Sequence, residues 1–216
     1  MIKINLRNVY GFEDAVHGMR NSHGSWNKSD SVWQSYGGKS GFCLGEQDLS
    51  LMRRLSTFGD DHAKFERFIH VVADINAPLY WWKEFDTYRA GVEKLSCSTM
   101  HSIHTKPFVA DDFSHDALDE GMDAVFSMVL LALNALRERY ITARNNAPWR
   151  QLIQLLPESY NQQRTVQVSY QALKNIYFAR ANHRLEEWHE FCEWALTLPY
   201  FNEICVGKPA ASEGHE

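Results

Sequence analysis

Residues 164–188 read RTVQVSYQALKNIYFARANHRLEEW, and their hydrophobic period changes partway along the stretch. From Thr165 to Tyr170 apolar and polar residues alternate, which is typical of a half-buried strand. From about Gln171 the apolar residues recur with the 3.6-residue period of a helix. A strand that leads directly into a helix presents polar side chains near the junction. Arg180 lies further along this predicted helix, and its forked guanidinium can bind a phosphate or a polarised carbonyl.

A second pattern lies upstream. The residues Gly59-Asp60-Asp61-His62 are followed by a strand-like run over residues 65–76 and then by Ala77-Pro78. Proline is well suited to the first turn of a helix, so a helix is predicted from Pro78 to about Ala90.

Together the two patterns resemble the flavin-dependent thymidylate synthase family. The family motif Ser-Leu-x-Asn-Phe-x-x-x-Arg corresponds to residues 172–180, ALKNIYFAR. The family order of Gly-x-x-His, strand and Ala-Pro corresponds to residues 59–78. The resemblance covers roughly residues 55–105 and 150–190 in the same order. It implies an α+β fold, mostly helical with a small sheet.

The resemblance also implies functional residues. Arg180 corresponds to an arginine that contacts and polarises the pyrimidine. With one inserted residue, Ser98 corresponds to a serine near the reacting base, and Glu84 falls where a substrate-binding glutamine is expected. The positions expected to hold the cofactor are His62, Arg89, Asn175 and His183.

The chemistry implied by the resemblance is a transfer of one carbon to deoxyuridylate (dUMP), a small-molecule nucleotide. Flavin adenine dinucleotide (FAD) carries the hydride, NADPH supplies electrons, and methylenetetrahydrofolate donates the carbon. The resemblance further implies that the active sites form where the subunits of a homotetramer meet. In the implied scheme the protein makes no covalent bond to the base, and catalysis comes from orienting the reactants and polarising the uracil carbonyl.

The chain departs from the family signature Arg-His-Arg-x-x-Ser-x-Asn-Glu-x-Ser-x-Arg-Tyr. Thr87 and Tyr88 stand at its first arginine and its histidine, and Met100 and His101 at its late arginine and tyrosine. Each lost cation removes a charge-assisted hydrogen bond worth roughly 1.5–3 kcal/mol. Two hypotheses therefore stay open. The chain is either a divergent FAD-dependent methyltransferase-like enzyme or a noncatalytic relative that keeps the fold for nucleotide binding or assembly.

Other sites receive less support. Three histidines and two aspartates between residues 101 and 115 match no usual ligand spacing, so no metal site is predicted. Ser98 and His101 have no supporting carboxylate at a meaningful spacing, which argues against a serine triad. The four cysteines form no C-x-x-C pair, and reduced, buried thiols are expected.

Bulk properties suit one domain over residues 1–216, because 44% of the residues are hydrophobic and 13% aromatic. The net charge of −5 argues against a nucleic-acid polymer as partner, since phosphate binding needs a basic face. No apolar run is long enough to span a bilayer, and the N-terminus lacks an apolar signal core. A cytoplasmic protein of a bacterium or of a phage-infected host, without a membrane partner, is expected.

The remaining segments are assigned from periodicity and breaker residues. Segments rich in Gly, Ser, Asn or Pro predict loops over residues 23–45 and 98–112, and a frayed tail after about residue 206. Regular elements are predicted as a strand over residues 3–6 and as helices over 46–58, from Ser114 to about Arg144, and over 148–156.

Overall fold

A computed structural model of the chain describes residues 2–36, 39–143 and 145–207. The chain divides into two compact units. Unit 1 comprises Met1–Ile4, Asp74–Thr87 and Lys94–Thr165, and unit 2 comprises Asn5–Ala73, Tyr88–Glu93 and Val166–Glu216. The prediction of a single domain stays a prediction.

The larger sheet has four strands in the order β1-β4-β6-β5. Its strands are β1 (Lys3–Tyr10), β4 (His70–Pro78), β5 (Val92–Ser96) and β6 (Asn161–Ser169). Each strand contributes residues to both units. β4 and β6 are antiparallel, because backbone hydrogen bonds join Leu79 to Tyr160 (3.1 Å) and Tyr170 to Ile69 (2.9 Å) at opposite ends of the pair.

The strand predicted over residues 65–76 begins later than expected. Residues Ala63–Arg67 form the 3-10 helix η3, and the strand β4 starts at His70. From there the side chains alternate between buried and half-buried, as the period of two predicts. The apolar residues Ala63 and Phe65 are buried, so they fit a strand pattern although they lie on a tight turn.

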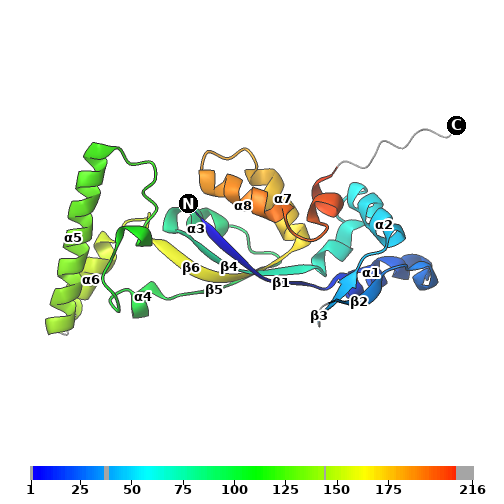
Figure 1. Ribbon diagram of the computed structural model, residues 1–216, viewed down its shortest axis with the longest axis horizontal. Helices are drawn as coiled ribbons and strands as arrows, with labels where there is room; N and C mark the ends of the chain where they lie inside the picture. The colour runs from blue at the N-terminus through cyan, green and yellow to red at the C-terminus, as the bar shows by residue number, and fades with distance from the viewer. Residues whose placement is uncertain (1, 37–38, 144, 208–216) are drawn as a thin grey trace. The chain divides into compact units, whose positions relative to one another are not determined.

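Unit 1 contains the helices α3 (Leu79–Phe85), α4 (Thr99–Ser102), α5 (Glu120–Ala143) and α6 (Asn146–Leu155). α5 packs along α6, as Figure 1 shows. Their shared core consists of Ile103, Phe108, Phe113, Leu133, Leu136 and Leu152. The helix predicted over 148–156 is confirmed by α6, and the predicted loop over 98–112 contains the one-turn helix α4.

The prediction that Ser114 begins the long helix is wrong. The Ser114 hydroxyl donates instead to the side-chain oxygen of Asn161, at 3.0 Å. The Asp119 carboxylate accepts the amide of Met122 at 3.0 Å, and α5 begins at Glu120. Aspartate is as good a helix cap as serine, so the sequence pattern alone could not choose between the two positions.

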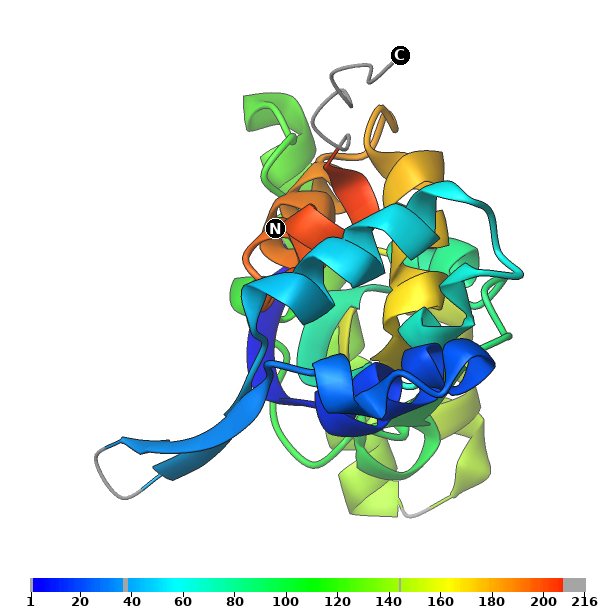
Figure 2. The same ribbon diagram turned by 90° about the vertical axis from the view of Figure 1, so that its right-hand side faces the viewer.

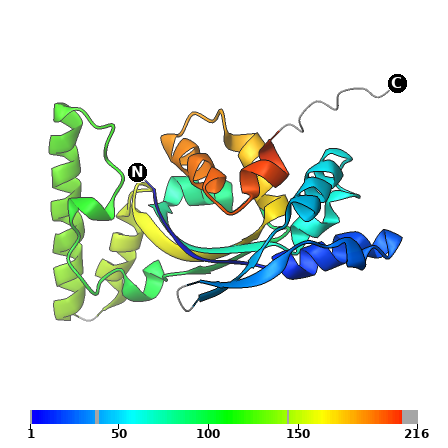
Figure 3. The ribbon, with the colours of Figure 1, turned by 45° about the vertical axis from the view of Figure 1, so that its right-hand side comes forward.

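Unit 2 contains the helices α1 (Phe12–Arg20), α2 (Glu46–Thr57), α7 (Tyr170–Arg180) and α8 (Glu186–Leu196), and the short segment η5 (Asn202–Val206). α7 packs against α8 and η5, which are coloured yellow to red in Figure 3. The largest fully buried side chains here are Trp188, Tyr170, Phe191, Phe201, Met52 and Ile69. The predicted helix over 46–58 is confirmed by α2, and Gly59 follows it with a φ of 92°.

The loop predicted over residues 23–45 is wrong in its second half, which contains an antiparallel hairpin of β2 (Val32–Tyr36) and β3 (Lys39–Cys43). The hairpin projects from unit 2 in Figure 2. Trp33 and Phe42 are cross-strand partners with ring centres 5.7 Å apart. Such pairs stabilise a ladder even where the composition is typical of a loop.

Three of the predictions fall on parts of the chain that are described only in part. Outside the described residues lie residues 37–38 of the predicted loop, residue 144 at the end of the predicted long helix, and residues 208–216 of the predicted tail. Within the residues that are described, no helix is long and apolar enough to cross a membrane.

The expectation of buried thiols holds for Cys192 and Cys205, whereas Cys97 is exposed and contradicts it. Burial raises the pKa of Cys192 to about 11, because a buried thiolate would lose its hydration. Cys97 directly follows β5 and lines a cavity whose other lining residues are polar.

Candidate functional site

The junction between β6 and α7 has the form predicted from the sequence. Ser169 ends β6, and its hydroxyl accepts a hydrogen bond from the amide of Ala172 at 3.3 Å, which caps α7. The cap satisfies one of the amides that a helix leaves open at its start. α7 then runs to Arg180, so this arginine occupies the last turn of the helix.

Arg180 lies among aromatic side chains. Its Nε donates a 2.8 Å hydrogen bond to the hydroxyl of Tyr88. Its Cζ lies 5.6 Å from the ring centre of Tyr88 and 4.8 Å from that of Trp188, which is fully buried. The imidazole of His183 meets the Trp188 ring edge-on, at 6.2 Å between centres. We call Arg180, Tyr88, Trp188 and His183 the Arg180 cluster.

The contacts within the Arg180 cluster fix the direction of the guanidinium. A cation on an aromatic face is worth about 0.5–2 kcal/mol, depending on how far it is desolvated. The Nε bond adds a directional constraint in the plane of the group, because hydrogen bonds weaken steeply away from linearity. Arg180 is half-buried, so the cluster orders its side chain without removing it from solvent.

Tyr88 lies outside α3, because this helix is shorter than predicted. The helix ends at Phe85, not near Ala90. The amide and the hydroxyl of Thr87 bond back to the carbonyl of Glu84, at 3.1 and 2.7 Å, and close a tighter turn. The chain therefore leaves the helix before Tyr88.

Gly91 fixes the other end of this turn. Its φ is 71°, a conformation that side chains disfavour, and its carbonyl accepts the amide of Ser169 at 2.9 Å. A Cβ added to Gly91 would lie 2.6 Å from the Ser169 hydroxyl. Only glycine lets the turn that carries Tyr88 approach the start of α7 this closely.

His62 lines a different part of unit 2, a cavity of about 670 Å³ that we call the His62 cavity. Its cationic or titratable lining comprises Lys28, Arg54, Arg20, His23 and His62, and its apolar lining includes Leu51, Leu55 and Phe58. No carboxylate and no member of the Arg180 cluster belongs to the lining among the described residues.

The charge of Arg20 in the His62 cavity is balanced by Asp48. Arg20 Nε and Nη2 lie 2.7 and 2.6 Å from one carboxylate oxygen of Asp48, which is fully buried. Burial opposes ionisation of Asp48, but hydrogen bonds from Ser29, Ser31 and Arg20 outweigh it and hold the pKa of Asp48 below its usual range. The remaining cations of the cavity are Lys28 and Arg54, both exposed.

Of the other predicted residues of unit 2, Arg89 and Asn175 are exposed and His183 is half-buried. Arg89 follows Tyr88 in the turn, and Asn175 lies on α7. Five positions along a helix correspond to a rotation of about 140°, so Asn175 and Arg180 project from different sides of α7. His183 belongs to the Arg180 cluster, and its Nδ1 accepts the amide of Leu185 at 3.2 Å.

Ser98 and Glu84 belong to unit 1. Ser98 precedes the short helix α4, and its neighbours Cys97 and Thr99 line a polar cavity of about 180 Å³. Glu84 is half-buried on α3. The convergence of these two residues with Arg180, His62, Arg89, Asn175 and His183 on one site stays a prediction.

Sequence reasoning missed an ion cluster in unit 1 next to the altered signature. The Asp86 carboxylate accepts Arg164 Nη1 at 2.8 and 3.1 Å, and Lys94 Nζ lies 3.0 Å away. Arg164 also stacks on Trp82, with Cζ 4.3 Å from the ring centre. Burial disfavours the charged carboxylate, but Lys94 and Arg164 outweigh it and lower the pKa of Asp86.

Tyr88 was also missed as a site residue, although one signal for it was present. It is an aromatic residue with a polar atom at the position where the family signature has histidine. The Asp86 cluster had no local signal, because Arg164 is 78 residues away from Asp86 in the chain.

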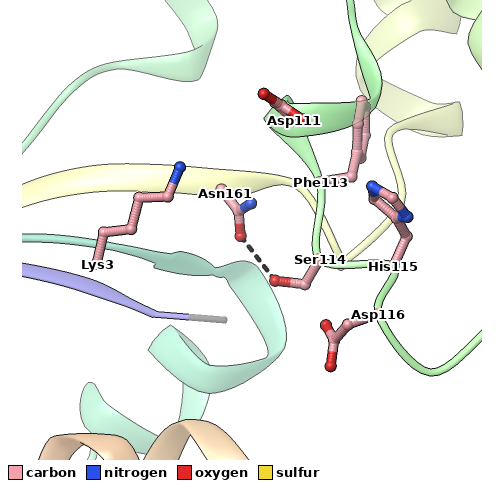
Figure 4. Close-up of a pocket in the computed structure, with 7 residues that line it drawn as sticks. All are labelled: Lys3, Asp111, Phe113, Ser114, His115, Asp116 and Asn161. Atoms are coloured by element: carbon pink, nitrogen blue, oxygen red, sulfur yellow. Dashed lines mark hydrogen bonds between the residues drawn. The ribbon is translucent and has the colours of Figure 1, made fainter.

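Figure 4 shows a further cavity of about 260 Å³ in unit 1. It is lined by Lys3, Asp111, Phe113, Ser114, His115, Asp116 and Asn161. Charges of both signs line it, so it favours no ligand of a single charge. In the described part of the chain, no three His, Cys, Asp or Glu side chains are grouped to hold a metal ion.

Solved structures with the same fold exist. One is thymidylate synthase X (ThyX) from Helicobacter pylori with FAD and dUMP, with a TM-score of 0.70 and 16% identity over 95% of this chain and 98% of its own. Another structure of flavin-dependent ThyX from Helicobacter pylori, also complexed with FAD and dUMP, has a TM-score of 0.72 and 18% identity over 94% and 98%. The chain thus has the fold of the flavin-dependent thymidylate synthases, which confirms the predicted fold class. No protein-family profile and no curated protein matches the sequence.

Proposed function

We propose that the protein is a divergent flavin-dependent enzyme that transfers a one-carbon unit to a pyrimidine deoxynucleotide, with dUMP as substrate. The observation that carries the proposal is the placement of Arg180. The arginine that the resemblance assigns to the pyrimidine ends α7 and is oriented by Tyr88 and Trp188. An oriented guanidinium can donate paired hydrogen bonds to a carbonyl or a phosphate.

The His62 cavity supports FAD as the cofactor. Lys28 and Arg54 suit a diphosphate, and Leu51, Leu55 and Phe58 suit an aromatic ring system. The cavity volume of about 670 Å³ lies in the usual range for a ligand site. When bound, the flavin supplies hydride transfer, with electrons from NADPH. Its proposed protein contacts are His62 in this cavity and, outside the cavity lining, Arg89, Asn175 and His183.

In the proposed reaction the protein positions its substrates and makes no covalent bond to the base. Arg180 polarises a carbonyl of the pyrimidine, Ser98 lies near its reacting edge, and Glu84 contacts the base or ribose. The carbon donor is methylenetetrahydrofolate. Holding two reactants in a productive orientation lowers the activation barrier substantially, because the reactants no longer have to meet and align in solution.

Self-association, as a homotetramer, is part of the proposal. The support for it is one side of α5, where Val125, Met128 and Leu131 recur every three positions and are 44%, 60% and 71% exposed. Apolar side chains gathered on one helix face are typical of an interface between protein chains. Light scattering of the purified protein measures the assembly directly.

The function is tested with purified protein and added FAD. We expect visible flavin absorbance on the protein and formation of thymidylate from dUMP when NADPH and methylenetetrahydrofolate are supplied. Arg180→Ala should lower turnover about 10²- to 10³-fold, as expected for loss of a donor to the transition state, and leave the flavin absorbance unchanged. Arg184→Ala, an exposed arginine on the same segment, is the matched control. Wild-type protein that takes up no flavin and converts no dUMP would contradict the proposal.

A noncatalytic, nucleotide-binding or assembly role is the alternative. It is favoured by the bond between Arg180 and Tyr88, because an arginine bonded within its own chain can serve the fold alone. This role predicts a stable oligomer whose melting temperature does not respond to dUMP, folate or FAD. A ligand present at 100 times its dissociation constant would instead add about 2.7 kcal/mol of stability.

A further inference from the structure

We infer that Tyr88 is a positioning residue, whose hydroxyl sets the orientation of the Arg180 guanidinium for nucleotide binding. The inference rests on the proposed function. It gives a role to Tyr88, a tyrosine at a position where the family signature has histidine. Its basis is the 2.8 Å hydrogen bond from Arg180 Nε to the Tyr88 hydroxyl.

The contacts with Trp188 and with the Tyr88 hydroxyl constrain the guanidinium in different directions. The buried Trp188 ring lies 4.8 Å from Cζ and restrains the group against tilting. The Tyr88 hydroxyl holds Nε and restrains rotation within the plane. With one edge held at Nε, the terminal nitrogens point in one direction, which is the requirement for a paired hydrogen bond to a nucleotide oxygen.

The Tyr88 hydroxyl is itself held in place by the backbone. The turn that carries Tyr88 ends at Gly91, whose carbonyl accepts the amide of Ser169 at 2.9 Å. Ser169 also caps α7, the helix that ends at Arg180. The turn that carries Tyr88 is therefore joined to the start of the same helix that ends at Arg180. A donor and an acceptor that are both held in this way lose little entropy when they pair.

The first test compares Tyr88→Phe with Tyr170→Phe. Tyr88→Phe removes the hydroxyl and keeps the ring on Arg180. Tyr170→Phe is the matched control, because it removes another hydroxyl of unit 2, one that donates to the carbonyl of Pro199 at 2.6 Å. Affinity for dUMP is measured by calorimetry on the FAD-loaded protein. The kcat and the KM for dUMP and for NADPH are measured alongside.

We expect Tyr88→Phe to weaken dUMP binding about tenfold, as for a lost hydrogen bond to a charged group, and to leave the KM for NADPH unchanged. Tyr170→Phe should lower the melting temperature and leave dUMP affinity unchanged. If Tyr88→Phe binds dUMP like wild type, the inference is overturned. If both substitutions weaken dUMP and NADPH alike, the effect is general destabilisation, which also overturns it.

A double-mutant cycle tests whether Tyr88 acts through Arg180. In an Arg180→Lys background, which keeps the charge and loses Nε, Tyr88→Phe should have no further effect on dUMP affinity. A full additional tenfold loss in that background would contradict the inference, because Tyr88 would then contact the nucleotide itself. Failure of the proposed function would give a different result, because the wild-type protein would then bind no dUMP. That result would overturn the inference as well.

Discussion

Lys174 and Glu66 form an ion pair between α7 and η3, with 2.9 Å between Nζ and a carboxylate oxygen. Glu66 has no exposed surface, and Lys174 is 17% exposed. The Ser56 hydroxyl donates to the same carboxylate oxygen at 2.7 Å, which adds α2 to the contact. Lys174 lies on the helix that ends at Arg180, so this ion pair holds the candidate site helix on the rest of unit 2.

Removal of the Lys174 ammonium should destabilise the protein. Lys174→Met leaves a buried carboxylate without its cation, so we expect the free energy of unfolding to fall by about 3 kcal/mol. Urea unfolding measures the change. Arg53→Met is the matched control, because the 3.3 Å pair of Arg53 with Glu46 is exposed and should contribute less than about 1 kcal/mol. Equal losses of unfolding free energy in Lys174→Met and Arg53→Met would contradict the prediction that burial makes the Lys174–Glu66 pair the more important one.

The Asp48 carboxylate should make stability depend on pH. Its pKa in the folded state lies below the ordinary value of 3.8, against the effect of its burial, because Ser29, Ser31 and Arg20 bond the charged form. Since the folded pKa is depressed, the stabilisation is complete above the unfolded pKa and is lost as the pH falls through the folded pKa. Asp48→Asn should therefore cost about 3 kcal/mol at neutral pH.

This cost of Asp48→Asn should shrink as the pH falls below about 4, because the wild-type carboxylate then becomes protonated as well. Urea unfolding from neutral pH down to acid measures the difference between the two proteins. Asp61→Asn is the control, since the Asp61 side chain is 93% exposed. A cost of Asp48→Asn that stays constant through acid pH would show that charge is not its source.

Gly91 should be intolerant of a side chain. Gly91→Ala places a Cβ 2.6 Å from the Ser169 hydroxyl at a φ of 71°, so we expect a loss of more than about 1–2 kcal/mol. Gly18→Ala is the opposite case, because Gly18 lies within α1 and its added Cβ meets nothing within 4 Å. It should stabilise the protein by about 0.5–1 kcal/mol. Thermal unfolding measures the change in stability of both variants. Changes of the same sign in the two variants would contradict this prediction.

Two leucines of α5 should respond differently to truncation. Leu133 is fully buried, so Leu133→Ala should cost about 2–5 kcal/mol. Leu131 is 71% exposed, so Leu131→Ala should change the stability of a lone chain by less than about 0.5 kcal/mol. Leu131→Glu should weaken self-association, which light scattering detects. An oligomer that is insensitive to this charge would place the interface elsewhere.

Regular elements with a strong period could be predicted from the sequence. The passage from β6 to α7 follows from the change of period near Tyr170, and α2 follows from its apolar spacing and from Gly59. Both depend on contacts between near neighbours in the chain, such as the cap of Ser169 on Ala172. Such contacts can be recognised from a short window of sequence.

Elements that depend on distant partners could not be predicted. The β2–β3 hairpin lies in a segment whose composition is typical of a loop, and the preceding Ser29 and Ser31 are held by Asp48 of α2. The start of α5 depends on which of two good caps the tertiary structure uses. In both cases local preference was weak, and a contact made elsewhere in the fold decided the outcome.

The features of the candidate site also separate into those that depend on near neighbours in the chain and those that depend on distant partners. The sequence by itself determined that Arg180 ends a helix that follows directly on a strand, because period and capping are local properties. Only the tertiary structure decided which side chains this arginine contacts. Tyr88 is 92 residues away in the chain, and its hydroxyl lies 2.8 Å from Arg180 Nε in a fold where the turn at Gly91 is bonded to Ser169. Directional contacts of this kind depend on positions in space that no sequence window contains.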